Sequence, residues 1–399
     1  MGRRQTRSEV IAKEPSILVI NVGSSTLKFA LFRVAGGDEP LLRGVLELSG
    51  SGGGEIRITD GEGREEDSRQ LSVSRDSAMT GLLDYLKATS RFDSIKSVGH
   101  RLVHGGPKLR APVRIDEEIR TLLEDIIPLA PDHLPTELGA IDEVARVAPS
   151  LTQVACFDTA FHANLPTVAR LFGLPRSLAE SGVVRYGFHG LSYEYVTETL
   201  RQRGALPRRT IIAHLGSGAS VSAILDGVSV DTTMGMTPTG GVVMGTRSGD
   251  LDPGVALYLL RYRGFSPADL DEAVNQRGGL LGISDLSADV RELLRASATD
   301  SRAADAISAF CYQVRKAVGG YAAALGGIDA LVFTAGIGER SPEIRARICD
   351  GCEFLGIEID PKLNSENAST ISTARSKVVI RTVKTNEEVM IARHVRAIA

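Results

Sequence analysis

The segment NVGSSTLKFALF, Asn21 to Phe32, combines a glycine–serine turn with an apolar run, and the apolar run SILVI precedes it. Apolar and β-branched residues on both sides of such a turn predict two strands, from Ile17 to Phe32, that form a β-hairpin. Glycine lets the backbone come close to a ligand, and serine hydroxyls donate hydrogen bonds beside the backbone N–H groups. The turn is therefore suited to hold an anion such as phosphate.

A second segment, TIIAHLGSGASVSAIL at 210–225, repeats this pattern. The two segments align without a gap, which places Asn21 on His214, Gly23 on Gly216, Ser24 on Ser217 and Leu31 on Ile224. A duplicated domain explains the alignment best, and coincidence between two common hairpins is the alternative. Because duplicated domains commonly bind ligands in the cleft between the copies, we expect the active site there.

The rest of the chain alternates helical and strand-like periods, which is typical of an α/β protein. Short alternating runs between Gly36 and Asp76 predict further antiparallel strands. The other expected strands are 94–104, 151–161 and 330–336, and the expected helices are 77–90, 116–130, 135–148, 303–325 and one that starts near Thr385.

Composition limits the class of protein. A chain of 399 residues exceeds the usual single core, so we expect two domains after a disordered tail at residues 1–15. A net charge of −3, with no basic tract among aromatics, argues against nucleic acid, and the apolar runs are too short for a membrane span. Four scattered cysteines indicate the cytoplasm, and a structural role for the pair Cys349 and Cys352 is favoured over redox chemistry or zinc binding.

A third glycine cluster, FTAGIGERSPEIR at 333–345, is expected where a strand ends and a helix begins, which also favours phosphate. Three such clusters suggest ATP, although the chain contains neither a Walker A motif nor a G-x-G-x-x-G after the first strand. Arg101 in GHRLVHGG and Arg247 in VMGTRSGD lie beside glycines and could bind anions, with a structural ion pair as the alternative for each.

Eight motifs of this chain resemble the acetate kinase family in order and spacing, from about Ser16 to the C-terminus. They are NVGSSTLKFALF, GHRLVHGG, CFDTAFH, RYGFHG, HLGSGAS, DTTMGMTPTGGVVMGTRSGDLDP, FTAGIGE and TNEE. The resemblance implies the acetate and sugar kinase/Hsp70/actin fold, which is ribonuclease H-like, with two duplicated α/β domains around a cleft. The implied N-terminal domain, for carboxylate and metal, is 16–160 plus 384–399, and the nucleotide domain is 161–383. A homodimer is also implied.

The resemblance further implies ATP-dependent phosphorylation of a short carboxylate to an acyl phosphate and ADP. The implied ligands of Mg²⁺, or of Mn²⁺, are Asn21 and Glu387. The implied catalytic residues are Arg101, Asp158, His189 and Arg247. The implied carboxylate site consists of Arg101, Val103, His133, Phe188 and Pro238. The implied nucleotide contacts are Lys28, His214, Leu215, Gly216, Ser217, Gly218, Asp289, Val290, Arg291, Gly336, Ile337, Gly338, Glu339 and Arg340.

The chemistry suits these residue types, because a carboxylic acid is already ionised at neutral pH and needs no general base. Repulsion between two anions must be overcome instead, by cationic groups and by alignment. On this reasoning Asp158 orients an arginine or a metal-bound water.

Four positions depart from the family pattern. Ser217, Tyr193 and Arg340 replace an asparagine, a histidine and an asparagine near the nucleotide. Asp132 replaces a leucine that helps to line the pocket for the methyl group of the substrate. A carboxylate there would repel an anionic substrate, so either Asp132 turns away, which we favour, or the substrate carries a polar group.

Acetate is the leading substrate, and propionate or another short acid is the close alternative. A non-catalytic nucleotide sensor of the same fold is disfavoured, because Arg101, Asp158, His189 and Arg247 are all present. A sugar kinase is disfavoured by the acetate kinase motifs.

Overall fold

The computed structural model describes residues 14–23, 26–49, 53–71 and 77–399, and the chain divides into two compact units. Unit 1 comprises the described residues up to Ala160 together with Asn386–Ala399, and unit 2 is Phe161–Thr385. The C-terminal segment therefore joins unit 1 from Asn386 rather than from residue 384.

Unit 1 is built on an eight-stranded sheet of order β5-β4-β3-β2-β1-β6-β8-β7. The predicted hairpin is present, since β1 and β2 pair antiparallel and Asn21 lies opposite Lys28. Strand β1 also pairs parallel to β6, and β6 parallel to β8, so β1 is a central strand and its apolar run is buried. The strands are β1 (Ser16–Val22), β2 (Thr26–Arg33), β3 (Pro40–Ser49), β4 (Gly53–Asp60), β5 (Glu65–Leu71), β6 (Ile95–Leu102), β7 (Val113–Arg114) and β8 (Thr152–Phe157).

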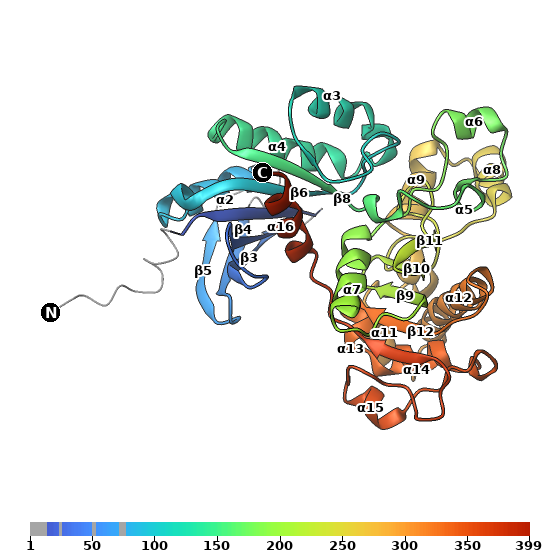
Figure 1. Cartoon of the computed structure of the whole chain (residues 1–399). Helices are drawn as coiled ribbons and strands as arrows, with labels where there is room; N and C mark the ends of the chain where they lie inside the picture. The colour runs from blue at the N-terminus through green and yellow to red at the C-terminus, as the bar shows by residue number, and fades with distance from the viewer. Residues whose placement is uncertain (1–13, 24–25, 50–52, 72–76) are drawn as a thin grey trace. The chain divides into compact units, whose positions relative to one another are not determined.

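Four helices of unit 1 are α2 (Ala78–Ala88), α3 (Glu117–Asp125), α4 (Leu134–Val147) and α16 (Glu387–Ile398). The helix predicted at 116–130 ends at Asp125 and gives way to a 3₁₀ turn, because Pro128 has no N–H to continue it. The C-terminal helix α16 packs on β1, β6 and β8, far from it in sequence (Figure 1). A Cβ at Gly99 of β6 would lie 2.5 Å from Cγ2 of Ile391, so the close approach of α16 requires glycine there.

Unit 2 contains a five-stranded sheet of order β11-β10-β9-β12-β13. In this sheet β9 pairs antiparallel to β10 and parallel to β12, as β1 pairs antiparallel to β2 and parallel to β6 in unit 1. The order β11-β10-β9-β12-β13 thus repeats β3-β2-β1-β6-β8, and the predicted duplication is confirmed. The strands are β9 (Arg209–Leu215), β10 (Ala219–Leu225), β11 (Val228–Thr232), β12 (Ala330–Thr334) and β13 (Val379–Thr382).

The gap-free alignment of the two hairpins is wrong beyond the turn. Asn21 pairs with Lys28 in the first hairpin, whereas His214 pairs with Ser220 in the second. The second turn is one residue tighter, because Gly216 N donates to the carbonyl of Gly218, while Gly23 N donates to the carbonyl of Thr26. Leu31 is therefore equivalent to Ala223 and not to Ile224, and Ser24 lies outside the described residues.

The helices of unit 2 include a long one, α12, which packs against α10, α11, α14 and β10. They are α5 (Thr167–Arg170), α6 (Arg176–Glu180), α7 (Gly190–Gln202), α8 (Pro253–Tyr262), α9 (Pro267–Asn275), α10 (Gly279–Ser284), α11 (Val290–Ala296), α12 (Ser301–Ala324), α13 (Ala335–Arg340), α14 (Pro342–Cys349) and α15 (Pro361–Ser365).

Glu14 and Pro15, which belong to the tail expected at residues 1–15, make contacts with the end of β2. Nε of Arg33 donates to the carboxylate of Glu14 at 2.6 Å, and the carbonyl of Pro15 accepts from the N–H of Val34 at 2.9 Å. Residues 14 and 15 thus belong to unit 1, and residues 1–13 lie outside the described part of the chain. No helix in the described ranges has the length and apolarity needed to cross a membrane.

The two cysteines of the C-x-x-C motif are buried as free thiols in unit 2. Burial raises the pKa of the Cys349 and Cys352 thiols. Both residues are therefore held as thiols in an apolar setting, where thiolate chemistry is disfavoured.

Candidate functional site

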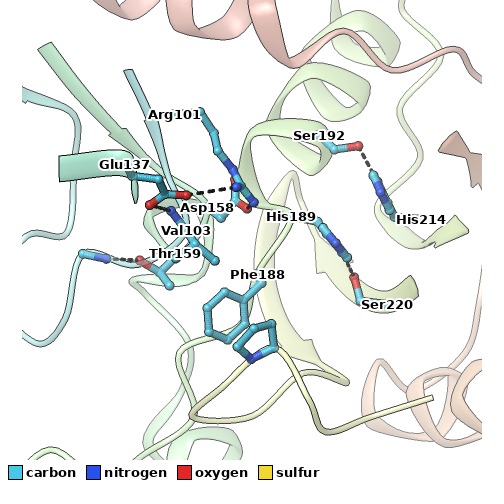
Figure 2. A network of polar contacts seen from close by, with 12 residues as sticks. Arg101, Val103, Glu137, Asp158, Thr159, Phe188, His189, Ser192, His214 and Ser220 are labelled. Carbon is cyan, nitrogen blue, oxygen red and sulfur yellow. Dashed lines mark hydrogen bonds and ion pairs between the residues drawn. The ribbon is translucent and has the colours of Figure 1, made fainter. Parts of the chain in front are cut away.

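Arg101 in unit 1 is held between two buried carboxylates (Figure 2). Its Nη2 donates to Oδ2 of Asp158 at 2.5 Å, and its Nη1 donates to Oε1 of Glu137 at 3.2 Å. The side chains of both acids are only 2% exposed, and that of Arg101 is 16% exposed. Nε of Arg101 is buried and finds no acceptor among the described residues.

The fold explains why these three side chains meet. Arg101 lies near the end of β6 and pairs with Cys156 of the parallel strand β8, and Asp158 follows the end of β8. The N–H of Asp158 donates to the carbonyl of Leu102 at 3.0 Å, which fixes the end of the ladder. Helix α4 brings Glu137 to the same place on its buried face.

Charge and burial compete within this cluster. Burial raises the pKa of Glu137 to about 7, against the effect of Arg101 and of the N–H of Val103, which donates to Oε2 at 3.0 Å. Burial would lower the pKa of Arg101, but Asp158 and Glu137 outweigh it and the pKa is raised. Arg101 is therefore a permanent cation, whereas the charge of Glu137 changes near neutral pH.

The two predicted metal ligands are both in unit 1. Glu387 begins α16, which packs on β1, the strand that carries Asn21. Asn21 and Lys28 are paired across the hairpin, so their side chains share one face, and Lys28 acts on the carboxylate of Glu387. Burial raises the pKa of Glu387, and Arg101 and Lys28 oppose this effect. A cation beside this carboxylate would offset the cost of its burial.

The remaining predicted residues of unit 1 surround the N-terminal end of α4. His133 precedes α4, and its carbonyl accepts the N–H of Glu137 at 3.1 Å, one turn along the helix. Val103 is buried. Asp132 is exposed.

His189 in unit 2 is hydrogen-bonded to Ser220 (Figure 2), which also contacts the hydroxyl of Tyr193. Its Nδ1 lies 2.8 Å from Oγ of Ser220, and the same oxygen lies 2.5 Å from the hydroxyl of buried Tyr193. Burial raises the pKa of Tyr193, so its hydroxyl keeps its proton. His189 also has a φ of 59°, a left-handed conformation that is uncommon outside glycine and often occurs at functional sites.

His214 of the second hairpin, like His189, is held by the hydroxyl group of a serine. Its Nδ1 lies 2.7 Å from Oγ of Ser192, which accepts a hydrogen bond from the hydroxyl of Thr385 at 2.8 Å. The rings of His189 and His214 are stacked, with centroids 4.2 Å apart and planes 15° from parallel. The two imidazoles thus form one layer beside the hairpin turn.

Arg247 faces the same turn. A Cβ placed on Gly218 would lie 3.1 Å from Nε2 of His189 and 3.6 Å from Nη1 of Arg247, so both groups border the backbone at Gly218. Nη1 of Arg247 also donates to the carbonyl of Pro238 at 3.2 Å. The structure therefore gathers a histidine, an arginine and a glycine-rich turn, a combination suited to phosphate.

The other predicted nucleotide segments lie around this turn. The N–H of Gly245 donates to the carbonyl of Ser217 at 3.1 Å, and a Cβ on Gly245 would lie 3.4 Å from the carbonyl of Ala288, beside the segment 289–291. A Cβ on Gly216 would lie 3.8 Å from Cβ of Ala335, beside the segment 336–340.

Contacts within those two segments are mainly structural. Asp289 caps α11 by accepting the N–H of Arg291 at 2.7 Å, and the two side chains form an ion pair. Glu339 accepts the N–H of Thr385 at 3.1 Å, and the carbonyl of Gly338 accepts from buried Arg345 at 2.8 Å. The side chains of Arg291 and Arg340 are exposed.

Phe188 is buried next to His189, and its carbonyl accepts a hydrogen bond from Nε2 of His162 at 3.0 Å. Nδ1 of His162 lies 2.7 Å from Oγ of Ser229, and burial lowers the pKa of His162 to about 4. His162 is thus a neutral support for the backbone that carries Phe188 and His189.

Glu137 was missed by the sequence reasoning, although the sequence contained a signal. It lies on the apolar stripe of its helix with Leu134, Leu138 and Ile141, which are all buried. A carboxylate on an apolar stripe has to find a cation or lose its charge. Ser220 was also missed, because its partner His189 belongs to a different segment.

Two repeats of a mixed sheet, with the strand order β3-β2-β1-β6-β8 in unit 1 and β11-β10-β9-β12-β13 in unit 2, define the fold of the acetate and sugar kinase/Hsp70/actin class. Residues 16–393 match the Acetokinase family. The chain is 43% identical to acetate kinase from Rhodopseudomonas palustris strain TIE-1 over 394 residues, which are 96% of this chain and 98% of that protein.

Solved structures agree. The chain resembles a propionate kinase from Francisella tularensis subsp. tularensis SCHU S4, with a TM-score of 0.90 and 35% identity, over 96% of this chain and 100% of that one. It also resembles acetate kinase from Porphyromonas gingivalis, with a TM-score of 0.86 and 38% identity, over 96% and 99%. The chain belongs to the acetokinase family.

Proposed function

We propose that this chain phosphorylates acetate with ATP, reversibly, and yields acetyl phosphate and ADP by direct in-line transfer. Curated relatives that are 42–43% identical over nearly the whole chain are named acetate kinase, which supports acetate as the substrate. The structural observation that carries the proposal is the part-buried Arg101, whose buried Nε finds no acceptor among the described residues, since a carboxylate is the natural acceptor for a guanidinium.

Unit 1 is the proposed carboxylate and metal side. Arg101 binds the carboxylate of the acid, and Val103 and His133 flank it. Because the acid is already ionised, no general base is required, and Asp158 acts by orienting Arg101, to which it is hydrogen-bonded. This alignment is the contribution of unit 1, since correct placement of two reactants supplies much of the rate.

Oxygen donors suit a hard divalent cation, and Asn21 with Glu387 would hold Mg²⁺, or Mn²⁺, which supplies positive charge beside the phosphates when bound. Mg²⁺ usually takes only one or two protein carboxylates and completes its shell with water and phosphate oxygens. This explains why two ligands are enough, although no group of three His, Cys, Asp or Glu side chains in the described ranges could hold a metal.

Unit 2 is the proposed nucleotide side, with Lys28 as a further contact from unit 1. The turn 214–218 and the segments 289–291 and 336–340 bind ATP, and Phe188 and Pro238 complete the acid site. Arg247 and His189 stabilise the charge that spreads over the phosphoryl oxygens during transfer, because both border Gly218.

Propionate is the second candidate, because a propionate kinase is among the similar structures. The two acids differ by one methylene, which a small apolar pocket distinguishes by only about 1–3 kcal/mol. Activity with both is therefore expected, with a higher kcat/KM for acetate.

The test is acid-dependent release of ADP, with acetate, propionate, butyrate and glucose as acceptors and with EDTA as a metal control. The expected result is release with acetate above propionate, little with butyrate, none with glucose, and loss of activity in EDTA. Release with glucose alone, or equal release without any acid, would contradict the proposal.

We also propose a cytoplasmic homodimer. Apolar side chains on α8 are exposed in the single chain, among them Leu257 at 47%, Tyr258 at 49% and Tyr262 at 73%. Such a surface is typical of a protein interface. Analytical ultracentrifugation of the wild type should give a dimer, and Tyr262→Arg should shift it towards monomer; a monomeric wild type would contradict this part.

A further inference from the structure

Glu137 makes two contacts that converge on the carboxylate site. Its Oε1 accepts from Nη1 of Arg101 at 3.2 Å, and its Oε2 accepts from the backbone N–H of Val103 at 3.0 Å. One carboxylate therefore fixes both the proposed anion-binding side chain and the backbone two residues further along. The side chain is 2% exposed, so no water competes for these contacts.

The charges around Glu137 are few and can be named. Arg101 comes from β6 and Asp158 follows β8, and among the described residues these are the charged groups that act on Glu137. Glu387, at the start of α16, acts on Arg101 as well. With Glu137 and Asp158 ionised, these two acids and Arg101 carry a net charge of −1. With Glu137 neutral, they carry no net charge. A substrate anion approaching Arg101 would meet less repulsion in the second case.

We propose that Glu137 is a positioning residue that holds Arg101 and the Val103 backbone for the acid substrate and sets the affinity for that anion by its own charge. This rests on the proposed carboxylate kinase function. Deletion of the side chain removes both contacts, whereas Glu137→Gln removes the charge and keeps one acceptor oxygen, which can retain one of the two contacts.

The charge of Glu137 changes within a pH range that is practical for assays, because burial raises the pKa of Glu137 to about 7. Acetate stays ionised from pH 6 to 8.5, so the substrate does not titrate in this range. We therefore expect the KM for acetate in the wild type to rise about three- to tenfold from pH 6 to pH 8.5, with a much smaller change in kcat at saturating Mg-ATP.

The experiment measures KM for acetate and kcat at pH 6, 7, 8 and 8.5 for wild type, Glu137→Gln, Glu137→Ala and Glu143→Gln. Glu137→Gln should have a KM for acetate that does not change with pH, because its side chain does not titrate. Glu137→Ala should raise KM about tenfold or more at every pH, because both contacts are lost.

Glu143→Gln is the matched control, because this acid is on the same helix but binds Thr80 and Arg146. The KM for acetate of Glu143→Gln should change with pH in the same way as that of the wild type. Equal KM profiles for an active wild type and Glu137→Gln would overturn the role of Glu137 alone, even if Glu137→Ala fails to fold. A wild type without activity towards any short acid would overturn both this inference and the proposed function.

Discussion

Ser220 lies 2.8 Å from His189 and links that ring to Tyr193, whose hydroxyl is 2.5 Å from the same Ser220 oxygen. If the buried tyrosine donates to Ser220, the Ser220 proton is available for Nδ1 of His189. The ring hydrogen is then placed on Nε2, the nitrogen that borders Gly218. Tyr193, a departure from the family pattern, is thus part of the support for a proposed catalytic residue.

Ser220→Ala should lower kcat about tenfold and leave the KM for ATP nearly unchanged, because one hydrogen bond that fixes the tautomer of His189 is lost. The control is Ser222→Ala, a buried serine on the same strand whose hydroxyl donates to the carbonyl of Asp231. Steady-state kinetics of the pair are the measurement. Equal losses in both variants would show that only packing of β10 is being measured.

Arg247→Ala should lower kcat by about 10³-fold with little change in ATP affinity, because the charge is needed mainly in the transition state. Single-turnover rates and ATP binding by calorimetry separate the two effects. Arg277→Ala removes an exposed arginine that pairs with Glu272 and should be silent. A wild-type kcat in Arg247→Ala would remove this residue from the mechanism.

Asp132→Leu should change the KM for acetate and for propionate by less than about twofold, because an exposed carboxylate is screened by water. The measurement is the pair of KM values in wild type and variant. A drop of about tenfold for either acid would mean that Asp132 faces the substrate during turnover.

The raised pKa of Glu137 also predicts that the free energy of unfolding depends on pH. Its pKa is about 7 in the folded protein, against an ordinary value of 4.5, so the folded state favours the proton and stability is lost as the pH rises between these values. Relative to wild type, Glu137→Gln should therefore gain about 2–3 kcal/mol in free energy of unfolding from pH 5 to pH 8.

Denaturation in urea, followed by circular dichroism, measures this gain. Glu143→Gln should keep an almost constant difference from wild type over this pH range, because the hydrogen bond from Arg146 lowers the pKa of Glu143 and its stabilising effect is lost only as the pH falls below the ordinary value of 4.5. A constant difference between Glu137→Gln and wild type from pH 5 to pH 8 would show that Glu137 is not titrating.

The sequence predicted the strands and the duplication because hairpins are local. Apolar runs on both sides of a Gly–Ser turn occur in both units, and β1–β2 and β9–β10 are where they were expected. The register beyond the second turn was not predictable, because the hydrogen bond from Gly216 to Gly218 that tightens it leaves no mark in the residue pattern.

Sequence reasoning identified the candidate site residues that lie in local motifs and missed those that depend on contacts between elements. Arg101, His189 and Arg247 were predicted as site residues because they lie in motifs, whereas Glu137 and Ser220 contact their partners on other elements. Such contacts depend on which helix packs on which strand end. The periodicity of the sequence indicates which face of α4 is buried. It does not indicate that Arg101 of β6 contacts Glu137 on that face.

The central claim is that the γ-phosphoryl group of ATP passes to the carboxylate of acetate. ³¹P nuclear magnetic resonance of ATP, Mg²⁺, acetate and the wild-type protein tests it directly, because it separates acyl phosphate from inorganic phosphate. The account predicts equal amounts of acetyl phosphate and ADP at early times, and no acetyl phosphate with Arg101→Ala. Formation of ADP with inorganic phosphate alone, at a rate independent of acetate, would contradict it.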